Sequence, residues 1–187
     1  MGRIEELAEQ YEQHIATPWQ RTVAGAQRVI IVVYDKELER TLRARTIAFE
    51  NATRQAGHKC FEVDITTAFA TWMAEDEYRE EYFSSPNDLQ LKLGAEFPAY
   101  VANRIRLALT QPGVDENTVV SVFGAGSLFG FARVSQVIQL VEGDIKGRLV
   151  LFFPGQLDRN NYRLLDARDG WNYLAVPITL YSEGRTC

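Results

Sequence analysis

Five residues of types that bind ligands lie at or just beyond the ends of predicted β-strands. They are Asp35, Asp64, Gly124, Gly126 and Ser127. Carboxylates bind metal ions or ribose hydroxyls, and glycine-rich turns at helix starts present backbone N–H groups to phosphates. In an open α/β sheet, ligands bind beyond the carboxyl ends of the strands, where these five residues would meet. The sequence therefore indicates a candidate ligand edge.

The glycine loop departs from the known phosphate-binding patterns. A P-loop requires Gly-x-x-x-x-Gly-Lys-Ser/Thr, and no lysine follows Gly126 or Gly130. The dinucleotide pattern Gly-x-Gly-x-x-Gly fails because Phe129 occupies its last position, and Leu128 and Phe131 add apolar bulk where phosphates would lie. A tight strand-to-helix turn is the alternative interpretation of this loop. Capping of the following helix or turn is the alternative role for the two aspartates.

The chain lacks a complete set of catalytic or metal-binding residues in sequence. His14 falls on a predicted helix and His58 at a turn, whereas a zinc site needs three or four ligands. Ser127 is misplaced for the Gly-x-Ser-x-Gly pattern of serine hydrolases. Cys60 and Cys187 suggest neither a disulfide framework nor a zinc site. We therefore expect a binding protein rather than an enzyme, with no cofactor and no metal.

The charge balance bears on nucleic-acid binding and on location. The 187 residues carry a net charge of −5, which argues against a sequence-independent nucleic-acid binder. A local basic face is the alternative, formed by Arg40, Arg43, Arg45 and Arg54. The acidic N-terminus has no apolar signal region and no apolar run approaches the length of a membrane span, so we expect a cytoplasmic protein.

Alternating strands and helices must position these residues. The predicted elements are helix 3–16, a connector over 17–27, strand 29–34, helix 36–56, strand 60–65, helix 67–82, helix 88–110 bent at Phe97-Pro98, strand 118–123, helix 129–141, strand 148–153 and strand 171–180. Pro154-Gly155 is expected to stop the fourth strand, and Pro177 indicates an edge position or an irregular end for the last. This order predicts one α/β domain over residues 1–187, with a mostly parallel sheet of about five strands flanked by helices. We expect a P-loop-NTPase-like topology without a Walker A motif.

Two polar segments offer surfaces for partners. Residues 75–81 are acidic and form either a solvated helix face or a docking patch for a basic partner. Residues 158–171 combine paired charges with Arg163, Arg168, Tyr162 and Trp171. Arginine and aromatic residues are enriched at interface hot spots, whereas the alternative is a hydrated loop leading into the last strand.

Three stretches of the chain resemble the BrxB family of BREX phage-defence systems. They are the glycine-rich run from Phe123 to Arg133, the strand from Leu149 that ends in Phe153-Pro154-Gly155, and Asn160-Asn161-Tyr162-Arg163. The opening strand, which ends in Tyr34-Asp35, is also similar to that family. Gln156-Leu157-Asp158 departs from the family's Tyr-Asp-Gly-like element.

The resemblance implies a small non-enzymatic adaptor that associates with larger defence proteins. These partners would be a PglZ-like phosphatase-fold protein, a BrxC-like ATPase or a PglX-like methyltransferase. From the resemblance and from the composition of segment 158–171 together, we expect the partner-binding residues to be Arg133, Pro154, Gly155, Tyr162, Arg163, Arg168 and Trp171.

Overall fold

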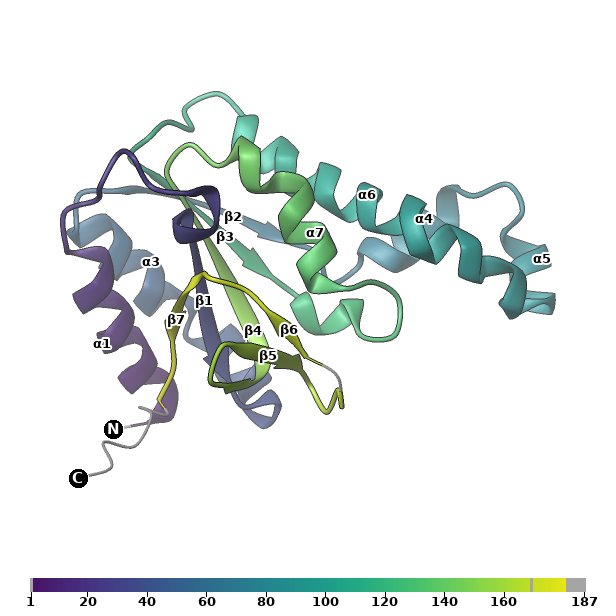
Figure 1. Cartoon of the computed structure of the whole chain (residues 1–187), viewed down its shortest axis with the longest axis horizontal. Coiled ribbons are helices and arrows are strands. Elements are labelled where there is room, and N and C mark those ends of the chain that lie inside the picture. Colours follow the sequence, from purple (N-terminus) through teal and green to yellow (C-terminus); the bar gives the residue numbers. More distant parts are fainter. Residues whose placement is uncertain (1, 169, 181–187) are drawn as a thin grey trace.

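The fold is an α/β arrangement in which helices cover both faces of one β-sheet (Figure 1). The structure is a computed structural model that describes residues 2–168 and 170–180. The strands are β1 (Val29–Tyr34), β2 (Lys59–Asp64), β3 (Thr118–Phe123), β4 (Arg148–Asp158), β5 (Asn161–Leu164), β6 (Trp171–Asn172) and β7 (Val176–Ile178). The α-helices are α1 (Arg3–Ile15), α2 (Glu39–Ala44), α3 (Thr46–Gln55), α4 (Ala68–Glu75), α5 (Arg79–Ser84), α6 (Gln90–Thr110) and α7 (Val134–Val141).

The central strands are buried on both sides because their residues are apolar throughout. All six residues of β1 and all six of β3 are buried. Alternate side chains of β1 enter opposite cores, as the period of two in a strand requires. Ile30 and Val32 pack with α1, α2 and α3, whereas Ile31 and Val33 pack with α4, α6 and α7. The sheet therefore separates two hydrophobic clusters.

The sheet is mixed and has seven strands, which corrects the prediction of a mostly parallel sheet of about five. Parallel pairing joins the strands in the order β2-β3-β4-β1-β7. β5 pairs antiparallel with β4, and β6 pairs antiparallel with β5. β7 lies at an edge, where Pro177 is tolerated, as the sequence predicted.

β4 runs through Pro154-Gly155 instead of ending there. Its parallel pairing with β1 extends to Tyr34 opposite Pro154, and its antiparallel pairing with β5 begins with Gly155 opposite Leu164. A Cβ on Gly155 would collide with the Arg163 carbonyl, so glycine permits this close approach. The end of β4 and all of β5 therefore lie beyond the point where the fourth strand was predicted to stop.

Three predicted helices are interrupted or shortened. The helix predicted over 36–56 is a short 3-10 turn, Lys36–Leu38, followed by α2 and α3, with a break at Arg45. The helix predicted over 67–82 divides into α4 and α5 where Asp76 accepts a hydrogen bond from the Tyr78 backbone N–H at 2.8 Å. The helix predicted over 129–141 begins at Val134, because the Phe131 ring instead stacks on Phe69 at 4.0 Å between ring centroids.

The strand predicted over 171–180 is instead two short strands, because β6 pairs with β5 and β7 pairs with β1. The other elements lie close to their predicted positions. The helix expected over 3–16 is α1, and strand 118–123 is β3 with the same bounds. The connector over 17–27 leads into a 3-10 turn, Gly25–Arg28. α6 has Pro98 inside it and is preceded by a 3-10 turn, Pro86–Leu89. With α4 and α5, its first half projects from the end of the sheet (Figure 1).

Candidate functional site

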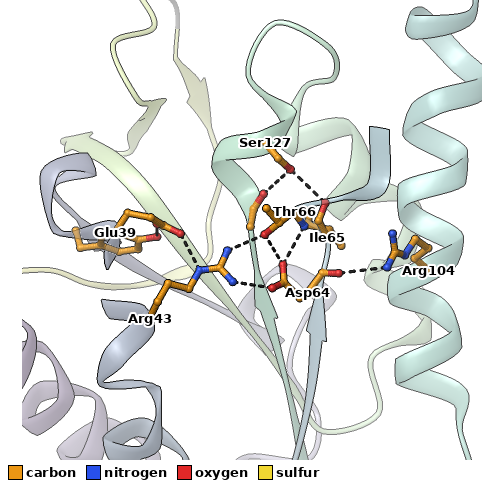
Figure 2. Close-up of polar contacts among 9 residues, drawn as sticks. Glu39, Arg43, Asp64, Ile65, Thr66, Arg104 and Ser127 are labelled. Carbon is orange, nitrogen blue, oxygen red and sulfur yellow. Dashed lines mark hydrogen bonds and ion pairs between the residues drawn. The ribbon is translucent and has the colours of Figure 1, made fainter. Parts of the chain in front are cut away.

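The carboxyl ends of β2 and β3 bring Asp64, Gly124 and Ser127 together, as the sequence predicted. Figure 2 shows Asp64 and Ser127 at this edge. β2 and β3 pair in parallel up to Asp64 opposite Phe123, so the loops that follow them meet at one edge. The Ser127 hydroxyl lies 2.7 Å from the Gly124 carbonyl oxygen and 3.2 Å from that of Ile65. The contacts tie the glycine loop to the loop after β2.

Arg43 of α2 is the centre of the polar network at this edge (Figure 2). Its guanidinium donates to Glu39 at 2.9 Å, to Asp64 at 2.6 Å and to the Thr66 hydroxyl at 2.7 Å. From the opposite side, Arg104 of α6 donates to the Asp64 carbonyl oxygen at 3.3 Å. The network therefore connects α2, β2 and α6 across the ends of the strands.

Gly124 is required by packing between the two loops. Its φ is +91°, in the left-handed region that favours glycine. An added Cβ would lie 2.5 Å from the Thr66 hydroxyl oxygen and 2.9 Å from an Asp64 carboxylate oxygen. Backbone N–H groups of the loop are also engaged, since Ser127 donates to Gly124 at 3.0 Å and Phe129 donates to Gly126 at 3.2 Å. These contacts favour the tight-turn interpretation of the glycine loop over a phosphate cradle.

The network holds Asp64 and Arg43 in the charged form. Burial opposes ionisation of Asp64, but hydrogen bonds from Thr66 and Arg43 outweigh it and lower the pKa of this carboxyl. Burial likewise opposes the charge on Arg43, but Glu39 and Asp64 raise its pKa. Burial, followed by a hydrogen bond to Glu39, raises the pKa of the Tyr34 hydroxyl above its ordinary value, so this group stays neutral. The result is a charged pair locked between two elements.

Asp35 and its neighbour Lys36 are also paired within the chain. Asp35 accepts a hydrogen bond from Arg3 of α1 at 2.6 Å, and Lys36 pairs with Asp166. Asp35 therefore lies at the same edge of the sheet but outside the network around Asp64. Both histidines lie elsewhere: the His58 ring stacks on Trp19 at 3.7 Å, and His14 is on α1. The edge thus offers hydroxyls and paired charges, with no histidine base beside Ser127.

The arginines proposed as a basic face are largely neutralised by neighbouring acids. Arg45 pairs with Glu5, Arg54 pairs with Glu50 at 2.5 Å, and Arg43 is held as described. Arg40 is exposed. Internal pairing of this kind leaves little positive field for phosphates.

The expected partner-binding residues divide into buried and exposed groups. Pro154, Gly155 and Tyr162 are buried, and Arg163 is half-buried with its Nε lacking a hydrogen-bond partner. Arg133 and Trp171 line a groove of about 600 Å³. It lies between residues 129–135 and the C-terminal hairpin, which is formed by β5, β6 and the described residues that connect them. Arg168 is exposed. The structure therefore brings Arg133 to Trp171, a proximity that sequence spacing alone did not reveal.

Trp171 belongs to an aromatic cluster that lies behind the groove. The Trp171 ring contacts the rings of Phe153, Tyr162 and Tyr173, with centroid distances of 6.4, 5.1 and 5.2 Å. Phe129, at the rim, is 47% exposed. Sequence analysis missed Phe129 as a surface residue because the predicted helix over 129–141 gave no reason for its exposure.

No protein-family model, curated protein or solved structure matches the chain. Across residues 2–168 and 170–180, no cluster of three or more His, Cys, Asp or Glu side chains is arranged to hold a metal ion. In the same part of the chain, no helix combines the length and apolarity needed to cross a membrane. Cys187 lies outside the described residues.

Proposed function

We propose that this protein is a non-enzymatic adaptor that binds a larger protein of a BREX-type anti-phage defence complex. The observation that carries the proposal is the groove between residues 129–135 and the C-terminal hairpin, where Arg133 and Phe129 stand beside Trp171. Aromatic and arginine side chains around an apolar pocket are typical of interface hot spots. The resemblance to the BrxB family supplies the class of partner, and one of the stretches that carry it, residues 123–133, overlaps the groove.

The ion pairs at the carboxyl edge make this edge a weaker candidate for the partner-binding surface than the groove. The guanidinium of Arg43 is already held by Glu39 and Asp64, and Lys36 pairs with Asp166. A ligand at this edge would have to break internal ion pairs. The groove requires no such exchange, since Phe129 and Arg133 are exposed.

Co-purification tests the adaptor proposal. The tagged protein would be co-expressed with the PglZ-like, BrxC-like and PglX-like proteins, and capture would be compared for the wild type, Arg133→Glu, Phe129→Ala and the control Arg40→Glu. We expect a hot-spot loss of about 2 kcal/mol, or roughly thirtyfold in affinity, for the two groove variants and little change for Arg40→Glu. Equal capture of all four proteins would place binding elsewhere. Absence of any stable partner, together with unimpaired defence in a deletion strain, would remove the proposal.

A second candidate is a nucleotide-binding domain with a degenerate P-loop-NTPase-like topology. It is favoured by the position of β1, which pairs in parallel with β4 on one side and β7 on the other and leads directly into a helical turn. A P-loop protein places its phosphate loop at such a strand–helix junction. Here the junction reads Asp35-Lys36-Glu37-Leu38.

Thermal-shift titration with ATP or GTP and Mg²⁺ tests this candidate. A ligand at one hundred times its dissociation constant stabilises the folded state by about 2.7 kcal/mol. We expect Lys36→Ala to abolish any shift that arises at this junction. A shift that persists in Lys36→Ala would assign the nucleotide to another site.

A further inference from the structure

A second cavity lies at the opposite edge of the sheet, where the parallel strands begin. It has a volume of about 520 Å³, within the range of small-molecule sites. Arg28 immediately precedes β1, Arg148 is the first residue of β4, and residues 114–116 lead into β3. The connector supplies Trp19 and Arg21. The cavity is therefore built from three stretches that are distant in sequence, residues 19–28, 114–116 and 143–148.

Four cationic side chains line this cavity, and within the described residues none of them forms an ion pair. They are Arg21, Arg28, Lys146 and Arg148. Arg28 donates to the Ile145 carbonyl oxygen at 2.8 Å, and Arg148 donates to that of Gly147 at 3.1 Å. Backbone carbonyls thus orient the two guanidinium groups without cancelling their charge. At the carboxyl edge, by contrast, Arg43 is held by two carboxylates.

The positive charges are held close to one another. Burial lowers the pKa of Arg148, and the nearby charge of Arg28 lowers it further. The Arg148 guanidinium also lies over the Trp19 ring at 4.8 Å, which restricts its position. A bound anion would relieve this repulsion, and arginine forks match the oxygens of phosphate groups.

The net charge of the lining selects the class of anion. Two carboxylates, Asp115 and Glu116, accompany the four cations, so the lining carries a net charge of two positive. Asp115 is engaged by Lys59 at 2.5 Å, a fifth cation beside the cavity. A phosphate monoester carries up to two negative charges near neutral pH and has three acceptor oxygens, whereas a carboxylate carries one charge and two oxygens.

We propose that the cavity at the amino ends of β1, β3 and β4 binds the phosphate group of a small ligand. Arg28 and Arg148 are the half-buried cations of its lining, and Arg21 and Lys146 are the exposed ones. The ligand is inorganic phosphate or a phosphate monoester such as a mononucleotide. This site is separate from the groove at Arg133 and does not depend on the adaptor function.

Calorimetric titration of the full chain with inorganic phosphate and with AMP tests the proposal, with acetate at equal ionic strength as the anion control. Arg148→Gln retains a hydrogen-bond donor and removes the charge. Lys146→Ala removes a charge at an exposed position, where the substitution leaves the core intact. Arg40→Ala, on α2, is the matched control for loss of one exposed cation. We expect Arg148→Gln to weaken phosphate binding about tenfold and Lys146→Ala about twofold to fivefold. Arg40→Ala should change it less than about twofold.

The outcomes distinguish inorganic phosphate from a mononucleotide as the ligand, and both from a nonspecific anion or a nucleic acid. Binding of phosphate and AMP with equal affinity supports a site for the phosphate group alone, and tighter binding of AMP supports a mononucleotide. Binding of neither ligand at about 10 mM would overturn the proposal. It would also be overturned if acetate bound equally well, if Arg40→Ala weakened binding as much as Arg148→Gln, or if a twelve-residue oligonucleotide bound more than about tenfold tighter than AMP. Circular dichroism checks that each variant is folded. If Arg148→Gln does not fold, Lys146→Ala still tests the proposal.

Discussion

Arg43 shows how a residue of a ligand-binding type can be occupied by the protein's own side chains. Its guanidinium meets two carboxylates and the Thr66 hydroxyl at the ends of the strands (Figure 2). Asp64 and Glu39 thereby take the positions that an external anion would occupy. At the other edge, Arg28 and Arg148 meet backbone carbonyls and keep their charge. The same residue type therefore stabilises the fold at one edge and is available for a ligand at the other.

Asp64 should contribute to stability above its unfolded-state pKa of about 3.8 and lose that contribution in acid. Because its pKa is lowered in the folded state, the unfolded chain takes up the proton first as the pH falls, so stability decreases through the folded pKa. We expect Asp64→Asn to cost about 1 kcal/mol or less at neutral pH, since the side chain is 53% exposed. The difference between the two proteins should close below pH 3.8.

Urea unfolding at pH values from neutrality into the acid range measures this difference directly. Other carboxylates contribute to acid unfolding equally in both proteins and cancel from the comparison. A gap between wild type and Asp64→Asn that stays constant across the acid range would contradict the proposed ionisation.

Arg159 occupies the left-handed backbone region, with φ of 56°, in the two-residue turn between β4 and β5. A non-glycine residue in this conformation destabilises the folded state by roughly 1–2 kcal/mol. Glycine removes that strain, but its greater conformational freedom in the unfolded chain offsets part of the gain. Arg159→Gly should therefore raise the free energy of unfolding by about 0.5–1 kcal/mol. Chemical denaturation measures the change, with the exposed Arg168→Gly as a control that should show no gain.

At the scale of elements, β4 joins the parallel part of the sheet to the antiparallel hairpin. Residues 149–154 of β4 pair with β1, and Gly155 begins the pairing with β5. The hairpin then places Trp171 opposite residues 129–135 and so forms the groove. The fourth strand was predicted to stop at Pro154, and its continuation beyond that residue forms the candidate interface.

Two glycine substitutions in different elements should have opposite effects on stability. Gly155→Ala should destabilise the protein by about 1–3 kcal/mol, because the added Cβ meets the Arg163 carbonyl and the Phe153 ring. Gly94→Ala should stabilise it by up to about 1 kcal/mol, because Gly94 lies inside α6 with open space around it. Urea denaturation of both variants provides the measurement. Destabilisation by both substitutions would contradict the packing difference between the two sites.

At the scale of the whole molecule, the two hydrophobic clusters share the strands of one sheet. Phe152 contacts Phe49 and Phe123 in the cluster with α1 and α3, whereas Phe153 contacts Tyr162 and Trp171 in the cluster on the other face. These neighbouring residues of β4 are both almost completely buried. Loss of either side chain should therefore weaken the whole chain rather than one layer.

Phe152→Ala and Phe153→Ala should each lower the free energy of unfolding by about 3–5 kcal/mol. Because both act through β4, unfolding should remain a single transition in each variant. Far-ultraviolet circular dichroism and tryptophan fluorescence, followed during the same urea titration, test this expectation. Two separated transitions in either variant would show that the two layers unfold independently.

The amino-acid sequence by itself determined the α/β class and the ends of the most apolar elements. The β-branched runs in β1 and β3 specify buried strands, and the amphipathic pattern of residues 3–16 specifies α1, because these signals are local and strong. The same pattern brought Asp64, Gly124 and Ser127 to one edge, since parallel strands align their carboxyl ends. Pro177 alone indicated an edge strand.

Tertiary structure decided which of these groups remain available. Whether a charge is cancelled depends on partners distant in sequence, as for Arg43 with Asp64 and Arg45 with Glu5. The continuation of β4 past Pro154 depends on pairing with β5, which no local sequence pattern predicted. Arg28 and Arg148 meet only because two parallel strands begin side by side, so periodicity could not reveal their shared cavity. The candidate ligand edge read from the sequence is filled by its own ion pairs, whereas Arg28 and Arg148, which form no ion pair within the described residues, lie at the opposite edge.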